Sequence, residues 1–164
     1  MAGSARELLE TRQSCLLAVS ASSFVPWLLA QPPERLFVRW GLFPGVTGAR
    51  SEASWDRVGA SRELSFDDRT SLTETIETLG GNSLSYAVSR FEGPFGKLVD
   101  SASARWDASE TARNSCEAVW TYSFAPRSVL GRPVLAPLLV AFQTGFMRQA
   151  MNRIANALRD SDAK

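Results

Sequence analysis

Polar and apolar residues alternate through the middle of the chain, which predicts a series of strands that each bury one face. The alternating segments are 47–54, 60–67, 71–79, 83–91, 97–106 and 111–124. Clusters of turn-forming residues separate the later segments, and they lie at 67–70, 80–82, 93–96 and 107–110. A short apolar run at 15–19 predicts one further strand before them. Consecutive strands joined by tight turns favour an antiparallel meander.

The period becomes helical after Pro126. Apolar residues recur at steps of three and four between Leu139 and Leu158, which predicts one amphipathic helix over about 134–159. At 1.5 Å per residue, such a helix is about 37 Å long and can cross a whole sheet. Pro33 favours the start of a short helix over 34–40. Because a sheet must bury its apolar face, we expect an α+β fold, in which six to seven antiparallel strands curve around the long C-terminal helix and short helices follow the first strand.

Length and charge restrict the class of protein. A chain of 164 residues favours one domain, expected over 13–160, with a flexible N-terminal segment at 1–12. The net charge is +1, and basic residues form no run, so nucleic acid is not an expected partner. The charged N-terminus has no apolar core of a signal peptide. The longest apolar stretch, 134–142, is too short to span a bilayer. We therefore expect a cytoplasmic protein without stable membrane insertion.

Histidine is absent, and the two cysteines, Cys15 and Cys116, are far apart and form no CxxC pair. These features argue against a metal site and against histidine-based catalysis. The chain also has no glycine-rich phosphate loop and no nucleophile elbow. We therefore expect no metal and no cofactor.

The order and spacing of these segments resemble the START/Bet v 1-like (SRPBCC) superfamily, and most of all its bacterial polyketide cyclase/dehydrase-like members. The matching segments are 33–46, 55–62, 73–74, 84–86, 93–95, 106, 119–126 and the final helix. The resemblance implies a helix-grip fold with an apolar cavity between the sheet and the C-terminal helix. It implies no single function, because the superfamily includes lipid carriers, hormone receptors, cyclases and chaperone co-factors.

Strand alternation places Arg62, Glu74 and Tyr86 on the inner face of the sheet. Three-residue loops at 68–70 and 80–82, without a bulge in either hairpin, make Arg62 and Tyr86 diagonal neighbours of Glu74. The sequence therefore predicts a polar cluster on an otherwise apolar surface.

Three interpretations of this cluster remain open. It can be an internal ion pair with a hydrogen bond that fills the sheet. It can orient a carbonyl, hydroxyl or carboxylate group of a ligand in a dry pocket. Finally, Glu74 can act as a general base whose pKa is raised by burial, although Arg62 beside it lowers that pKa. Arg62, Glu74 and Tyr86 are thus candidate ligand-binding residues and weaker candidate catalytic residues.

Large apolar side chains on the last strands and on the final helix could line a cavity or could form an ordinary core. The further candidate ligand-binding residues are Trp106, Trp120, Tyr122, Phe142, Phe146 and Met147. Trp27, Trp40 and Trp55 lie in or near the loops at the expected cavity mouth, where a tryptophan can be a lid over the ligand or a plug for the end of the sheet.

Three functions follow from this reading. The first is binding of an apolar or amphipathic small molecule, such as a lipid, a polyketide or an aromatic metabolite, in a cavity of several hundred cubic ångströms. The second is a cyclase or dehydratase that needs neither metal nor cofactor. The third is a protein-interaction module with a filled cavity and an exposed apolar patch. A homodimer is left open.

Overall fold

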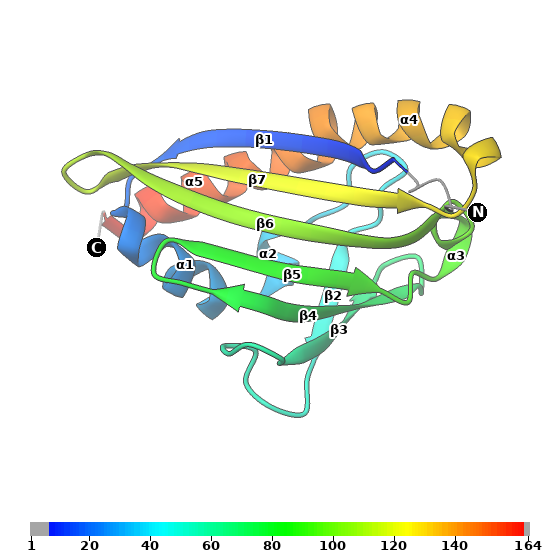
Figure 1. Cartoon of the computed structure of the whole chain (residues 1–164). Helices are drawn as coiled ribbons and strands as arrows, with labels where there is room; N and C mark the ends of the chain where they lie inside the picture. The colour runs from blue at the N-terminus through cyan, green and yellow to red at the C-terminus, as the bar shows by residue number, and fades with distance from the viewer. Residues whose placement is uncertain (1–6, 163–164) are drawn as a thin grey trace.

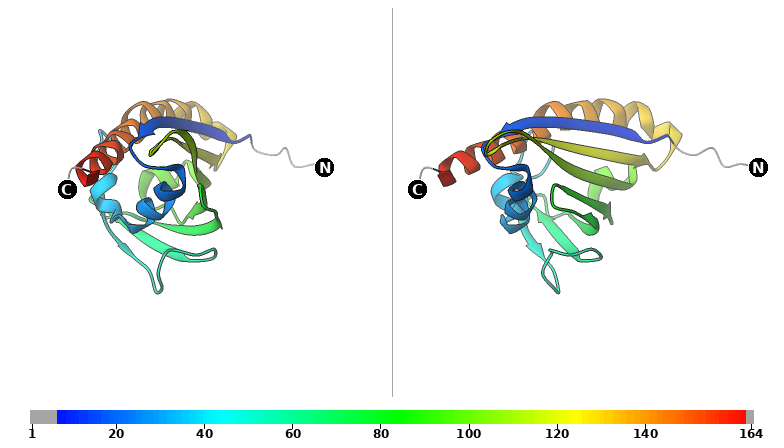
Figure 2. Two further views of the ribbon diagram at one scale, coloured as in Figure 1. Left: turned by 90° about the vertical axis from the view of Figure 1, so that its left-hand side faces the viewer. Right: turned by 60° about the vertical axis from the view of Figure 1, so that its left-hand side comes forward.

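A seven-stranded antiparallel sheet curves around a long C-terminal helix in the computed structural model, which describes residues 7–162 (Figure 1). The strand order is β1-β7-β6-β5-β4-β3-β2. Seen from the end, the strands wrap around short helices that close one side of the sheet (Figure 2). The helix-grip fold class predicted from the sequence is confirmed.

The strands are β1 (Leu9–Leu17), β2 (Val46–Arg50), β3 (Ser61–Phe66), β4 (Ser71–Leu79), β5 (Ser83–Ser89), β6 (Val99–Ala112) and β7 (Ser115–Pro126). The short helices are α1 (Ala21–Ala30), α2 (Pro33–Leu36) and α3 (Gly93–Gly96). The C-terminal helix consists of η1 (Val129–Gly131), α4 (Arg132–Ala141), the π-helical η2 (Phe142–Met147) and α5 (Arg148–Asp162).

Strand β1 begins earlier than predicted. It pairs with β7 along its whole length, from Leu9 opposite Phe124 to Leu17 opposite Cys116. The prediction of a flexible segment over 1–12 is therefore wrong for residues 9–12, whereas residues 1–6 lie outside the described part of the chain. Polar residues such as Glu10 and Arg12 face solvent on the outer side of β1, so the polar character of this segment is compatible with a strand.

Strand β6 continues through the turn predicted at 107–110. It pairs with β7 as far as Ala112 opposite Ser115, and the chain reverses at Arg113 and Asn114. Asn114 adopts a left-handed backbone with φ of 55°, a conformation that asparagine tolerates in tight turns. The polar residues in the predicted turn instead lie largely on the exposed face of a long strand.

Short helices were expected after the first strand, but none was placed over 21–30, because Pro26 lies inside α1 and removes a backbone donor. Its buried residues, including Phe24 and Leu28, pack toward β6. Tertiary packing of an apolar face thus outweighs the local cost of the proline. The short helix predicted over 34–40 is also shorter than expected, because α2 ends at Leu36.

The C-terminal helix extends beyond the predicted 134–159 and covers the free edge of β1. The side chain of Gln13 donates a hydrogen bond to the Gln143 carbonyl oxygen at 2.9 Å, and the Arg12 backbone N–H donates to Gln143 Oε1 at 2.8 Å. These contacts protect an edge strand from pairing with another chain. In η2, Gly145 provides the space in which the Trp40 ring packs, since a Cβ atom there would lie 2.4 Å from the indole.

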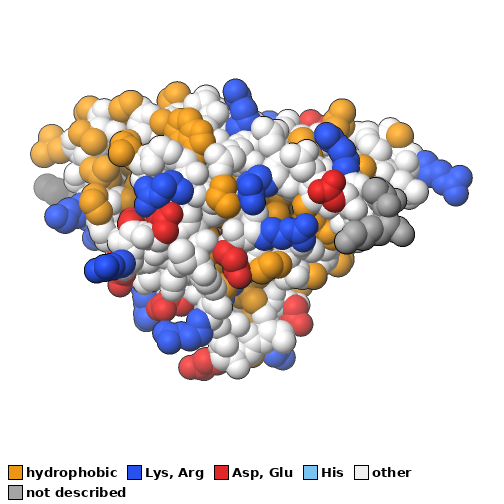
Figure 3. Space-filling model, turned by 180° about the vertical axis from the view of Figure 1, so that it is seen from behind, with side chains coloured by type: hydrophobic (Ala, Val, Ile, Leu, Met, Phe, Trp, Pro, Cys, Tyr) orange, Lys and Arg blue, Asp and Glu red, His pale blue; other side chains and the backbone are white. Residues whose placement is uncertain are grey.

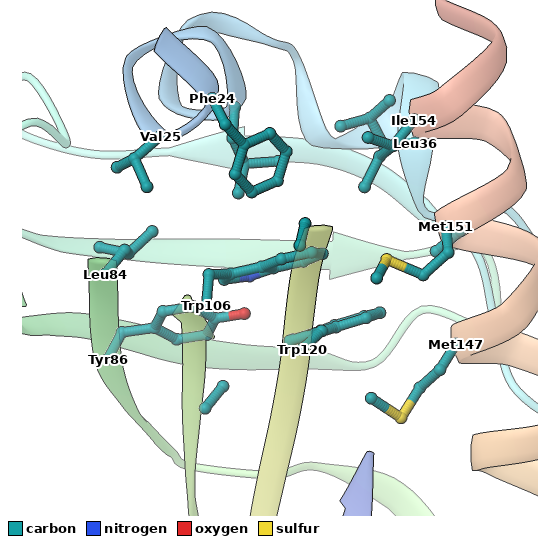
Figure 4. Close-up of a cluster of buried hydrophobic side chains, with 14 of the residues drawn as sticks. Phe24, Val25, Leu36, Leu84, Tyr86, Trp106, Trp120, Met147, Met151 and Ile154 are labelled. Carbon is teal, nitrogen blue, oxygen red and sulfur yellow. The ribbon is translucent and has the colours of Figure 1, made fainter. Parts of the chain in front are cut away.

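Two stacked indoles occupy the centre of the core (Figure 4). The rings of Trp106 and Trp120 are 4.7 Å apart and nearly parallel, at 10°. Met147 and Met151 reach toward them from the C-terminal helix, and both methionines are fully buried. The inner face predicted for β7 is confirmed, because its alternate residues from Cys116 to Phe124 face the core.

Candidate functional site

The predicted polar cluster is present on the inner face of the sheet. Arg62 on β3 donates a hydrogen bond from Nε to Oε2 of Glu74 on β4 at 2.6 Å. The two side chains are only 12% and 5% exposed, and Tyr86 on β5 is buried near them. The prediction that these residues share one face and form at least one direct hydrogen bond is confirmed.

The Arg62–Glu74 register differs from the predicted one by two residues. Arg62 lies directly opposite Glu74 rather than diagonally. The hairpin loop begins one residue earlier than expected, because the Phe66 N–H donates to the Thr70 carbonyl oxygen and Arg69 takes a left-handed conformation. A shift of two residues keeps every side chain on the same face of the sheet. Arg62 and Glu74 therefore still face inward together, as predicted.

The β4–β5 hairpin has the predicted pairing of Ile76 with Tyr86, but a different loop produces it. The Gly80 N–H donates to the Ser83 carbonyl oxygen, which leaves a two-residue turn. A bulge between Ile76 and Thr78 then restores the register. The expectation of a hairpin without a bulge is wrong, since the shorter loop and the bulge offset each other.

Tyr86 is held as a neutral phenol among other aromatic groups. Its hydroxyl accepts hydrogen bonds from Tyr122 and Trp106. Burial, followed by the nearby Glu74 carboxylate, raises the pKa of Tyr86 well above its ordinary value. Tyr86 therefore acts in this site as a hydrogen-bonding group without charge.

Burial also raises the pKa of Glu74 above its ordinary value of 4.5, and the charge and hydrogen bond of Arg62 oppose this with a smaller effect. Within residues 7–162, Thr11 and Glu74 are the only polar or charged residues that are buried. Removal of the Glu74 carboxylate from water therefore affects its pKa more than the ion pair with Arg62 does.

The raised pKa predicts how stability depends on pH. A carboxyl group that binds its proton more tightly in the folded state contributes stability below its unfolded pKa, and this contribution is lost as pH rises through the folded pKa. We therefore expect the unfolding free energy of the wild type to fall relative to Glu74→Gln as pH increases from about 4.5 to 8. Urea unfolding of both proteins at each pH measures this difference. A difference that moves in favour of the wild type with rising pH would show that Arg62 outweighs burial.

Trp55, in the loop between β2 and β3, covers the cluster. The Arg62 guanidinium carbon lies 3.5 Å from the centroid of the Trp55 ring, which is a cation–π arrangement. The same ring meets Tyr86 nearly edge-on, with centroids 5.7 Å apart. Among the described residues, no group accepts a hydrogen bond from the buried Trp55 Nε1. Trp55 therefore presents an unused donor beside a satisfied ion pair.

The cavity beside the cluster is far smaller than the several hundred cubic ångströms predicted. It measures about 20 Å³ and is bordered by Arg62, Tyr86 and Trp106, among others, which is room for about one water molecule. The space predicted between sheet and helix contains packed side chains of Trp106, Trp120, Met147 and Met151. The prediction of a large cavity is thus wrong, because aromatic side chains fill the interior.

Most of the predicted ligand-lining residues belong to this packed interior. Phe142 and Phe146 stack on each other with centroids 5.3 Å apart, and Tyr122 stacks on Phe124 at 5.2 Å. Met147 is fully buried. These residues and Trp120 border neither the small cavity nor the groove described next.

A larger space lies on the outer side of Trp55. This α1 groove has a volume of about 590 Å³. It is lined by Val25, Pro26, Leu29, Ala30, Ser54, Trp55, Asp56, Leu79 and Gly80. Trp55 also borders the small inner cavity, so its indole is a wall shared by the two spaces. The sequence predicted a lid or plug at Trp27, Trp40 or Trp55 without distinguishing among them. The other lining residues were missed because no helix was placed over 21–30.

Comparison with known proteins identifies the fold. The sequence matches no protein-family model and no curated protein. Among solved structures, norcoclaurine synthase from Thalictrum flavum, in complex with dopamine and hydroxybenzaldehyde, aligns with a TM-score of 0.68 and 12% identity, over 93% of this chain and 87% of its own. A START superfamily protein from Mycobacterium smegmatis aligns with a TM-score of 0.68 and 8% identity, over 92% and 97% of the two chains. A Streptomyces aromatase/cyclase aligns with a TM-score of 0.66 and 14% identity, over 93% and 94%.

Proposed function

We propose that this START/Bet v 1-like protein binds a neutral, largely apolar or aromatic small molecule in the α1 groove, with a hydrogen-bond acceptor of the ligand directed at Trp55. The observation that carries the proposal is the position of Trp55. Its indole is both a wall of a groove of about 590 Å³ and the cover of the buried Arg62–Glu74 pair. The groove has the size of a typical small-molecule site and is mostly lined by apolar side chains.

The charges of the site favour a neutral ligand. Arg62 is already paired with Glu74, so the buried pair carries no net charge toward the groove when both groups are ionised. The unused polar atom is the donor Nε1 of Trp55. A carbonyl or hydroxyl oxygen on an aromatic ligand would satisfy this donor, while Val25 and Leu29 of α1 would contact the apolar part of the ligand. The aromatic molecules present in the norcoclaurine synthase structure support this ligand class.

A second function, a cyclase or dehydratase without metal or cofactor, is favoured by the raised pKa of Glu74. A carboxyl group that holds its proton more tightly is better matched to proton transfer near neutral pH. The resemblance in fold to an aromatase/cyclase is consistent with that chemistry. Trp55 would have to move before a ligand in the groove could reach Glu74, because the indole lies over Arg62. Binding in the groove requires only that the indole turn enough to expose its buried Nε1, while the Arg62–Glu74 pair stays in place, and it is therefore the preferred proposal.

The proposal is tested by a conservative change at Trp55. Trp55→Phe keeps an aromatic wall and removes the Nε1 donor, so affinity for 4-hydroxybenzaldehyde and related neutral aromatic carbonyl compounds should fall about 2- to 10-fold, the value of one hydrogen bond. Isothermal titration calorimetry measures the affinity, and ligand-induced thermal stabilisation provides a second readout.

Trp40→Phe is the matched control, because Trp40 packs against Gly145 and lines neither space. It should leave affinity unchanged. Equal losses in both variants would contradict a role for the Trp55 donor. Absence of binding across a broad panel of neutral aromatic compounds would contradict the proposed function itself.

A further inference from the structure

The outer side of the first half of the C-terminal helix is apolar and exposed. Val129, Leu130, Val134 and Val140 are 72%, 90%, 55% and 61% exposed, and Pro133, Ala136 and Pro137 between them are exposed as well. We call these seven residues the α4 face. Figure 3 shows hydrophobic side chains gathered at the upper left of the molecule, where this part of the helix lies. Contiguous apolar surfaces of this kind mark interaction sites.

The second half of the same helix has a different outer side. Arg148, Asn152, Asn156 and Arg159 on α5 are exposed, which is the expected pattern for a helix that packs one face on a sheet. On α4 the inner side is anchored by Leu135 and Leu139, which are buried in the core. The apolar outer side of α4 is therefore additional to what the fold requires.

The charge distribution indicates which partner suits this face. Residues 118–159 contain five arginines and no aspartate or glutamate. Arg127 and Arg132 lie at the beginning of the helix, and Arg148 follows the α4 face at its other end. Glu7 lies within 3.4 Å of Arg132, and Asp100 lies within 3.4 Å of Arg127, so two of these charges are partly balanced at the surface. Exposed Lys97 adds a further positive charge close to Arg127.

We propose that the α4 face docks on the surface of an anionic lipid bilayer. An apolar helix face flanked by arginines can bury its side chains at the boundary between headgroups and acyl chains, while each nearby basic residue attracts acidic headgroups. By length and composition, Val129–Ser161 could cross a membrane, but its inner side is packed against the sheet. Docking parallel to the surface buries the α4 face without unfolding the domain.

A second copy of the chain suits this face less well. Two α4 faces packed together in antiparallel orientation would bring Arg132 of one copy near Arg148 of the other. Residues 118–159 contain no acidic side chain, and Glu7, which lies beside Arg132, balances that charge only in part. Like charges at an interface oppose association. The α4 face also lies at the end of the molecule away from α1 (Figure 1), so membrane docking and ligand binding in the α1 groove are independent.

Vesicle co-sedimentation tests the proposal. The full chain should bind vesicles of phosphatidylcholine and phosphatidylglycerol at a ratio of 3:1 and should bind pure phosphatidylcholine vesicles markedly less. Raising the salt concentration from 0.05 to 0.5 M should reduce binding to the anionic vesicles. The double variant Leu130→Ser/Val134→Ser should lower the partition coefficient at least about tenfold, because it removes two large apolar side chains from the docking surface.

The double variant Leu16→Ser/Val58→Ser is the matched control. Leu16 and Val58 are 65% and 61% exposed but lie outside the α4 face, so their replacement should leave vesicle binding unchanged. Equal binding to neutral and anionic vesicles, or equal losses in both double variants, would overturn the proposal. A dimer in light scattering that Leu130→Ser/Val134→Ser dissociates, without vesicle binding by the wild type, would assign the face to self-association instead.

Discussion

Glu74→Ala is expected to lower the free energy of unfolding by about 3–5 kcal/mol at neutral pH, the usual cost of removing one partner from a buried ion pair. The cost arises because Arg62, whose side chain is only 12% exposed, would remain charged without its carboxylate. The cation–π contact with Trp55 cannot replace a hydrogen bond at 2.6 Å. Urea unfolding followed by tryptophan fluorescence measures the change.

The neighbouring position on β3 provides the control. Glu63 pairs with Arg50 at 3.2 Å, but these side chains are 43% and 85% exposed. Solvent screens such pairs, so Glu63→Ala should cost less than about 1 kcal/mol. Replacing both Arg62 and Glu74 with leucine should recover much of the lost stability, since no buried charge then remains unpaired. Similar losses for Glu63→Ala and Glu74→Ala would show that burial of the Arg62–Glu74 pair does not matter.

Trp106→Ala is the second change with a large expected effect, a loss of about 3–5 kcal/mol. The substitution removes a fully buried indole, its stacking on Trp120 and its hydrogen bond to Tyr86. Trp120→Ala removes the partner of the stack, but Trp120 Nε1 is itself buried without a hydrogen-bond partner among the described residues. Its removal should therefore cost about 1–3 kcal/mol less than that of Trp106.

The Trp106→Ala variant should also acquire a binding site that the wild type lacks. The space left by the indole would join the cavity of about 20 Å³ that Trp106 already borders. Free indole should then raise the melting temperature of the variant, increasingly with its concentration, by more than it raises that of the wild type, because the α1 groove is present in both proteins and the new space only in the variant. A variant that loses little stability and does not respond to indole would contradict this prediction. The surrounding side chains would then have moved into the space of the indole, and Trp106 would not be required to fill the interior.

The periodicity of apolar residues was sufficient for the architecture. Alternation over 71–79 and 83–91 and the helical spacing after Leu139 are local patterns, so the strands, the final helix and their order could be read from the chain. The same alternation placed Arg62, Glu74 and Tyr86 on one face. That conclusion survived errors in the loops because the side-chain period of a strand is two and the register error was also two.

Turns and helix α1 were harder to predict because their conformations depend on distant partners. Asp107 to Glu110 has the composition of a turn, yet pairing with β7 keeps it extended. Pro26 disfavours a helix locally, yet burial of Phe24 against the sheet outweighs that preference. Without α1, the groove that it forms with Trp55 could not be expected from the sequence.

The sequence by itself therefore determined the helix-grip fold and the face of the sheet on which Arg62, Glu74 and Tyr86 lie. Both follow from the periods of two and 3.6 residues along the chain. Only the tertiary structure decided whether the interior is open or filled. Trp106 and Trp120 stack across neighbouring strands, and Met147 packs beside them from a helix that begins after the last strand. Cavity volume depends on how such distant side chains interlock, which no local pattern encodes. The same packing moved the candidate ligand site from the interior to the outer side of Trp55.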